Sequence, residues 1–183
     1  MIQLEVLTEI TDCYNSFVKE LYESTFPADE RRNWDDLLTL CRSNPAHTFN
    51  LILKGEKPAG FLISWQLEDF VFMEHFAVDH HLRGRGIGKE VIRLWLSRQD
   101  SPVLLEVEPP VHADQKRRIV FYEQLGFRLH DVEYWQPPYS PDKHVLPMKL
   151  MSYGNLDVES RFAEIKRVLQ SVVYGMENNE LPL

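Results

Sequence analysis

Cysteine, long apolar runs and positive net charge are all scarce in this sequence of 183 residues. The only two cysteines, Cys13 and Cys41, lie in segments with helical periodicity, which argues against a disulfide framework and predicts buried, inert thiols in a cytoplasmic protein. No window approaches the roughly 18 apolar residues of a membrane-spanning helix, and the first residues show no signal-peptide pattern. The formal net charge of −8 disfavours a nucleic acid. We therefore expect neither a membrane nor a nucleic acid as a partner.

The composition is that of an ordinary globular protein. Hydrophobic residues make up 44% of the chain and charged residues 26%, and the length suits one domain with a single core. We predict a domain over residues 1–151 and a helical extension over residues 152–183, which packs on the domain or on a second subunit. The protein is expected to be a monomer or a homodimer.

Hydrophobic periodicity predicts the order of helices and strands. Apolar runs predict about seven strands, at residues 2–7, 48–54, 59–67, 70–78, 102–108, 127–135 and 144–151. Apolar spacings of three and four predict helices at residues 8–26, 28–43, 87–96, 114–125 and 157–175. The predicted fold is mixed α/β, with a central, mostly antiparallel sheet flanked by helices. In that sheet, strand 102–108 is expected to run parallel to strand 70–78.

A glycine-rich segment joins strand 70–78 to the helix at 87–96. Its three glycines, Gly84, Gly86 and Gly88, let the backbone approach a ligand closely. The helix N-terminus that follows presents free N–H groups to an anion. The segment is therefore either an anion site or a tight turn with solvated arginines.

The segment does not match the two best-known phosphate loops. A Walker A motif would need glycine and Ser or Thr where Arg83 and Glu90 stand. A dinucleotide-binding fingerprint would need its third glycine where Lys89 stands. What remains is the pattern R-x-x-G-x-G, formed by Arg83, Gly86 and Gly88.

Three motifs in this order resemble the GNAT superfamily of acyl-CoA N-acyltransferases. They are EHFAVDHHLRGRGIGKEVI at 74–92, LLEVE at 104–108 and RRIVFYEQLGF at 117–127. The resemblance covers the order of elements from residue 2 to residue 151. It implies a GNAT acetyltransferase domain, acetyl-CoA as the cofactor and an amine as the acceptor.

In that family the glycine loop wraps the diphosphate of coenzyme A, and the preceding strand binds the pantetheine arm as an added strand would. The cofactor-binding residues implied here are Phe76, Ala77, Val78, Arg83, Gly84, Arg85, Gly86, Ile87, Gly88 and Lys89. The basic cluster Lys116, Arg117 and Arg118 is expected to be a solvated helix start, with contact to the cofactor's 3′-phosphate as the alternative.

Transfer of an acetyl group to an amine requires a base that removes a proton from the ammonium form. Three carboxylates interrupt otherwise apolar strands: Glu74, Glu106 and Glu108. The resemblance implies that the base, acting directly or through water, lies on one of two strands that splay apart. Glu74 and Glu106 rank together and Glu108 follows, and the alternative for each is a solvent-facing position. Alternation places Glu74 on the strand face of Phe76.

The departing thiolate needs a proton donor. Tyr122, in the motif FYEQLGF, matches the tyrosine that has this role in the family. A tyrosine, with its ordinary pKa near ~10, remains protonated at neutral pH. The alternative is a core aromatic residue on an amphipathic helix.

The resemblance implies an acceptor pocket built from the early helices and from the loop before the last strand. The residues predicted to line it are Arg31, Trp34, Trp135 and Tyr139. Arg31 and Arg32 could pair with a substrate carboxylate. Carboxylates near the reaction centre favour a small cationic amine as the acceptor, and a protein amine is the alternative.

The seven histidines form no zinc-binding motif, and His80 and His81 would point to opposite sides of an extended chain. We therefore expect no metal site. Two rival functions remain open. One is a coenzyme-A-binding or sensing module of the same fold without turnover, and the other is a P-loop kinase, which Arg83 and Glu90 disfavour.

Overall fold

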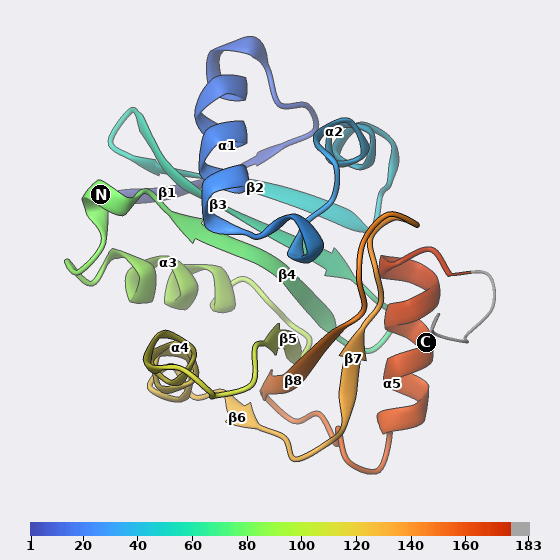
Figure 1. Ribbon diagram of the computed structural model, residues 1–183. Helices are drawn as coiled ribbons and strands as arrows, with labels where there is room; N and C mark the ends of the chain where they lie inside the picture. Colours follow the sequence, from blue (N-terminus) through green and yellow to red (C-terminus); the bar gives the residue numbers. More distant parts are fainter. Residues whose placement is uncertain (177–183) are drawn as a thin grey trace.

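The computed structural model describes residues 1–176, which form a mixed sheet with helices packed on both faces (Figure 1). The strands are β1 (Ile2–Leu7), β2 (His47–Lys54), β3 (Lys57–Gln66), β4 (Val71–Val78), β5 (Val103–Val107), β6 (Arg128–Leu129), β7 (Tyr134–Gln136) and β8 (Leu146–Tyr153). Their order is β1-β2-β3-β4-β5-β8-β6, and β7 also pairs with β8. Each of these pairings is antiparallel except that of β4 with β5, which is parallel. The predicted fold class is confirmed.

Helices cover the sheet in two layers. They are α1 (Asp12–Thr25), the short turn η1 (Ala28–Glu30), α2 (Trp34–Ser43), the turn η2 (His80–Leu82), α3 (Ile87–Leu96), α4 (Ala113–Glu123), α5 (Phe162–Val168) and the π-helical turn η3 (Leu169–Val173). Figure 1 shows α1 and α2 on one face, α3 and α4 on the other, and α5 beside β7 and β8. Within residues 1–176, no helix is both long and apolar enough to cross a bilayer.

The C-terminal helix is held by apolar packing. Ile165, Leu169 and Val173 recur every four residues, so they lie on one face of the helix. All three are buried in a cluster that includes Trp65 and Leu104. This packing fixes the end of η3 next to the middle of the sheet. The predicted extension also includes residues 177–183, which lie outside the described part of the chain.

Strands β4 and β5 separate halfway along their length. They pair only from Val71 to Met73 on β4, against Val103 to Leu105 on β5. Opposite β3, His75 pairs with Ile63 and Met73 with Ser64, so Glu74 is an extra residue in a β-bulge. A bulge bends and twists its strand locally. The point where the two strands part is therefore marked by Glu74 on one strand and Glu106 on the other.

The bulge also changes which side chains share a face of β4. Met73 and Phe76 pack in the cluster under α3 and α4, whereas Ala77 packs in the cluster under α1 and α2. Strict alternation would have placed Met73 and Phe76 on opposite faces. The predicted alternation of Glu74 with Phe76 therefore breaks down at the bulge.

Two predicted elements are divided in the structure. The predicted helix 28–43 becomes η1 and α2, because the chain is extended at Arg31 and Asn33. The predicted strand 127–135 becomes β6 and β7. Leu129 of β6 pairs with Met151, and Tyr134 of β7 pairs with Met148. The chain therefore advances five residues from Leu129 to Tyr134 while β8 advances only three. The extra residues leave the ladder between the two short strands.

The predicted limits of two helices were also wrong. The first helix begins at Asp12, four residues after its predicted start at residue 8. Asp157 caps only a turn, by accepting a hydrogen bond from the Ser160 N–H at 3.1 Å, and α5 begins at Phe162. Cys41 is buried, as predicted, whereas Cys13 is exposed.

Candidate active site

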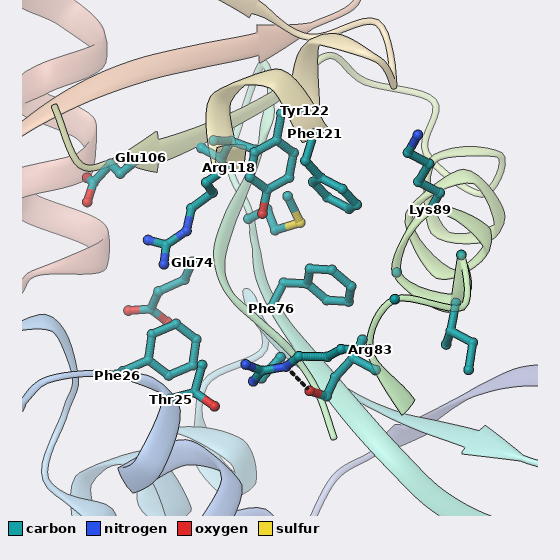
Figure 2. Close-up of a pocket in the computed structure, with 18 residues that line it drawn as sticks. Thr25, Phe26, Glu74, Phe76, Arg83, Lys89, Glu106, Arg118, Phe121 and Tyr122 are labelled. Carbon is teal, nitrogen blue, oxygen red and sulfur yellow. Dashed lines mark hydrogen bonds between the residues drawn. The ribbon is translucent and has the colours of Figure 1, made fainter. Parts of the chain in front are cut away.

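A groove of about 600 Å³ opens where β4 and β5 separate (Figure 2). Its walls come from both strands, from the glycine-rich loop, from α4 and from the end of α1. Nine of the ten predicted cofactor residues line it, and Arg85 is the exception. Of the predicted catalytic residues, Glu74, Glu106 and Tyr122 line the groove, whereas Glu108 does not. The parallel strands thus bring together residues from three separate motifs.

One end of the groove is built to hold an anion. Gly84 and Gly86 have φ angles of 75° and 77°, which only glycine adopts readily. Gly86 caps α3, and the first backbone N–H bonded back to it is that of Glu90. The earlier N–H groups of α3 therefore lie free at the positive end of the helix dipole. The Arg83 side chain lines the same end, fixed by a 3.0 Å hydrogen bond from its Nε to the Val78 carbonyl (Figure 2).

Glu106 lies where β5 leaves β4, with one tyrosine on each carboxylate oxygen. The Tyr134 hydroxyl donates to Oε1 at 2.6 Å, and the Tyr174 hydroxyl donates to Oε2 at 2.8 Å. Burial raises the pKa of Glu106 to about 7, although both hydrogen bonds act to lower it. A carboxyl group whose pKa lies near neutral pH can take up and release a proton under working conditions.

Glu74 also lines the groove but has a different environment. Its carboxylate accepts hydrogen bonds from Arg32 Nη2 at 2.8 Å and from the Trp65 indole N–H at 2.9 Å. Burial acts to raise the pKa of Glu74. The Arg32 guanidinium, the neighbouring histidines His75 and His47 and the Trp65 hydrogen bond together outweigh burial, and the pKa falls to about 2. A carboxylate that holds its charge so firmly is a weak base at neutral pH.

The α4 helix supplies the third wall of the groove. Burial raises the pKa of Tyr122 to about 12, so its hydroxyl stays protonated at neutral pH. One turn earlier, Arg118 lines the groove and forms an ion pair with Glu108. Glu108 is therefore directed to α4 instead of into the groove. Figure 2 draws Glu74, Glu106 and Arg118 toward one side of the view and Arg83 and Lys89 toward the other.

The four predicted acceptor residues do not line this groove. Trp135 and Tyr139 line a second hollow, of about 730 Å³, together with the loop 138–145. Arg31 donates from Nε to the Phe26 carbonyl at 3.0 Å, and Trp34 packs against Tyr22. Arg32, considered for a substrate carboxylate, is buried against Glu74.

Several residues in or next to the groove were absent from the predicted set. Thr25 and Phe26 end α1, and Phe121 precedes Tyr122 on α4. Tyr134 and Tyr174 reach Glu106 from 28 and 68 residues away in the sequence. No local pattern connects positions so far apart, although a tyrosine in the C-terminal apolar stripe is a weak signal for a buried hydroxyl that needs a partner.

The histidine pair next to the loop differs from its predicted arrangement. His80 and His81 lie in η2 instead of extended backbone, with ring centroids 3.8 Å apart. With Asp79 they could bring three ligand atoms within 4.8 Å of one another. Both histidines are exposed, and the Asp79 side chain already accepts a hydrogen bond from the His81 N–H. This cluster gives no argument for a metal.

The fold and the groove define an enzyme-like site for an elongated anionic ligand, with titratable groups at the far end. The chain belongs to the acetyltransferase (GNAT) family, since the model of that family matches residues 13–127. The predicted family and enzyme class are thereby confirmed.

Individual relatives agree with this membership. A GNAT-family protein of known structure from Bacteroides thetaiotaomicron is 35% identical, with a TM-score of 0.90 over 96% of this chain and 99% of its own. YjbC of Bacillus subtilis (strain 168), a candidate acetyltransferase, is 23% identical over 72% of this chain and 76% of its own. A Bacillus subtilis acetyltransferase solved in complex with CoA shares the fold, at 14% identity and a TM-score of 0.56, over 85% of this chain and 100% of its own.

Proposed function

We propose that this protein transfers the acetyl group of acetyl-CoA to a primary amine, by direct attack of the amine in a ternary complex. One observation carries the proposal: Glu106, with a pKa of about 7, lines the groove at the point where β4 and β5 separate. A coenzyme A molecule laid along β4 with its diphosphate at residues 83–89 would bring its thioester to that point.

The donor side fits coenzyme A in charge and in shape. The diphosphate would rest on the free N–H groups of α3, with Arg83 beside it. The backbone of Phe76, Ala77 and Val78 borders the gap that β5 leaves, so it can pair with the amides of the pantetheine arm. The Bacillus subtilis acetyltransferase of the same fold that was solved with CoA is consistent with this cofactor. The Lys89 ammonium group donates a hydrogen bond to the Gln124 side chain. To contact the phosphates, Lys89 would have to break this hydrogen bond.

The acceptor step needs a proton to leave the amine. An alkylammonium group has a pKa near ~10.4, so it is protonated at neutral pH and cannot attack. We assign Glu106 as the general base, acting directly or through one water, because its pKa is far better matched to neutral pH than that of Glu74. The amine nitrogen then bonds to the carbonyl carbon.

The donor step needs a proton for the thiolate. When the carbon–sulfur bond breaks, the sulfur leaves with the electron pair and takes a proton from the Tyr122 hydroxyl. A thiol has a pKa near ~8.5, below the value of about 12 for Tyr122, so the Tyr122 oxygen must regain a proton once the thiol has formed. That proton comes from the nitrogen, which after the attack still carries one proton more than the amide, and Glu106 releases the first proton to solvent. The products are the acetamide and free coenzyme A.

The charges around the acceptor end favour a cationic amine. Arg32 and Arg118 form ion pairs with Glu74 and Glu108. Burial, and then the nearby Glu108, raise the pKa of Glu30 to about 6, and burial raises that of Glu106 to about 7. A second positive charge on the acceptor would stabilise the ionised forms of these two groups. We therefore expect diamines to react faster than amino alcohols of the same length, which carry no second positive charge.

The test combines an amine panel with one substitution. Thiol release from acetyl-CoA is followed with the panel, and Glu106→Gln is expected to lower kcat/KM by about 100-fold or more while leaving coenzyme A affinity unchanged. Glu123→Gln, at an exposed position of α4, is the matched control. If Glu106→Gln turns over as fast as the unmodified protein, Glu106 is not the general base. Tight coenzyme A binding with no thiol release across the panel would favour a non-catalytic binding module.

We also propose that residues 1–151 form the acetyltransferase domain and that residues 152–183 are its extension. A cytoplasmic location is proposed as well, because both cysteines are free thiols.

A further inference from the structure

The last turn of the C-terminal helix is linked by hydrogen bonds to both carboxylates of the groove. Tyr174 donates to Glu106 Oε2 at 2.8 Å, and the Val173 carbonyl accepts from Arg32 Nη2 at 2.6 Å. Arg32 in turn binds Glu74. The extension therefore contacts one carboxylate directly and the other through a single arginine.

Both contacts come from the end of the π-helical turn η3. In η3 the Tyr174 N–H bonds to the Leu169 carbonyl, five residues back, so the turn is one residue wider than in an α-helix. The Val173 carbonyl belongs to the last turn, where carbonyls have no partner within the helix. Arg32 supplies that partner. Gly175, with φ of 66°, then leads the chain away from the helix.

We propose that Tyr174 is a positioning residue for acetyl transfer, which holds Glu106 in place and sets its proton affinity together with Tyr134. The proposal rests on the assignment of Glu106 as the base. It makes the C-terminal extension part of the active site. Tyr174 itself does not line the groove.

The two hydroxyl groups act on the ionised form of Glu106. A buried carboxyl group without donors would stay protonated and could accept no proton from an amine. Each tyrosine donates to one oxygen, which favours the carboxylate and leaves further lone pairs on both oxygens for the acceptor. The pKa values of Tyr134 and Tyr174 are raised well above their usual range by burial and by Glu106, so both remain donors at working pH.

Other charged and titratable groups also face Glu106. Glu74 on β4 raises the pKa of Glu106, because two negative charges repel. Tyr139, in the loop before β8, lies within electrostatic reach of Glu106. Arg118 and Tyr122 of α4 line the same groove. Removing one tyrosine hydroxyl leaves these groups in place, so the resulting shift isolates the hydrogen bond.

The direct test is a carbon-13 NMR titration of the Glu106 carboxyl in the full chain, with its signal assigned by Glu106→Gln. We expect Tyr174→Phe to raise the midpoint by about one pH unit, because the ionised form loses a donor while the ring packing is kept. Tyr134→Phe should act in the same direction. Ser171→Ala removes an exposed hydroxyl from the same turn, which bonds only backbone carbonyls, and should leave the midpoint unchanged. An unchanged midpoint in Tyr174→Phe overturns the proposal.

Kinetics separate this proposal from the proposed function. With the amine that reacts fastest in the panel, the acid limb of kcat/KM should move to higher pH in Tyr174→Phe by the shift that NMR measures, with coenzyme A affinity unchanged. If the NMR midpoint of Glu106 shifts in Tyr174→Phe while the acid limb of kcat/KM stays in place, Glu106 is not the base. That result overturns the positioning role. A Glu106→Gln protein that is inactive, beside a Tyr174→Phe protein with neither shift, would refute Tyr174 alone and leave the base in place.

Discussion

Replacing Glu74 by glutamine tests whether this groove residue is structural. The substitution keeps the size of the side chain but leaves the Arg32 guanidinium buried without a counter-charge. Arg32 is 8% exposed and the Glu74 side chain 0%. We expect the free energy of unfolding at pH 7 to fall by about 3 kcal/mol, since losing one partner of a buried ion pair typically costs about 3–5 kcal/mol.

The pKa of Glu74 gives a second route to the same magnitude. The pKa is about 2 in the folded protein and 4.5 in the unfolded chain. Because the folded value is the lower one, the stabilisation is fully present above pH 4.5 and is lost as the pH falls through about 2. This difference corresponds to roughly 3 kcal/mol at pH 7 and to roughly 1 kcal/mol at pH 3.

Urea denaturation at 25 °C, measured at pH 7 and again at pH 3, is the assay. Glu164→Gln makes the same chemical change in the exposed pair with Arg161 and should leave the unfolding midpoint unchanged within error. A loss for Glu74→Gln below 1 kcal/mol at pH 7 would refute the role of the ion pair. So would an equal loss at both pH values, because a charge effect must shrink as Glu74 becomes protonated.

Two further predictions concern the donor side of the groove. Tyr122→Phe should lower kcat by about 100-fold or more with little change in acetyl-CoA affinity, in steady-state and binding assays, and equal turnover would remove the acid assignment. Gly86→Ala should lower stability by about 1–2 kcal/mol and weaken coenzyme A binding, because φ is 77° there although nothing lies within 4 Å of the added carbon. Gly88→Ala, where an added Cβ meets Phe121 at an ordinary 3.5 Å, is the control for stability, and equal stability of the two variants would contradict the backbone argument.

Local patterns predicted the parts of the fold that depend on neighbours in sequence. The apolar runs up to Val78 predicted the antiparallel strands, and the glycines after them predicted the helix entry that holds the anion end of the groove. The motif order also predicted that Glu106 and Tyr122 would lie with the glycine loop. The strands and the helix entry follow from periodicity and turn chemistry, which short segments carry by themselves. The grouping of Glu106 and Tyr122 with the loop was implied by the resemblance to the GNAT superfamily.

The features that were missed depend on tertiary contacts. The sequence around Arg32 does not predict that its guanidinium is buried, because its partner, Glu74, lies 42 residues away. The same holds for the break between β6 and β7, which is set by their register on β8. Alternation could not place Glu74, since a β-bulge adds a residue that no period-two pattern contains.

The roles of the two groove carboxylates follow from their surroundings and not from their positions. Both stand where β4 and β5 part, and sequence could only rank them together. An arginine at 2.8 Å keeps Glu74 charged, whereas neutral tyrosine donors leave Glu106 close to its titration point near neutral pH. Two carboxyl groups whose surroundings give them very different pKa values can have different chemical roles. On this argument Glu74 anchors Arg32, and through it the C-terminal turn, while Glu106 is left to exchange a proton with the amine.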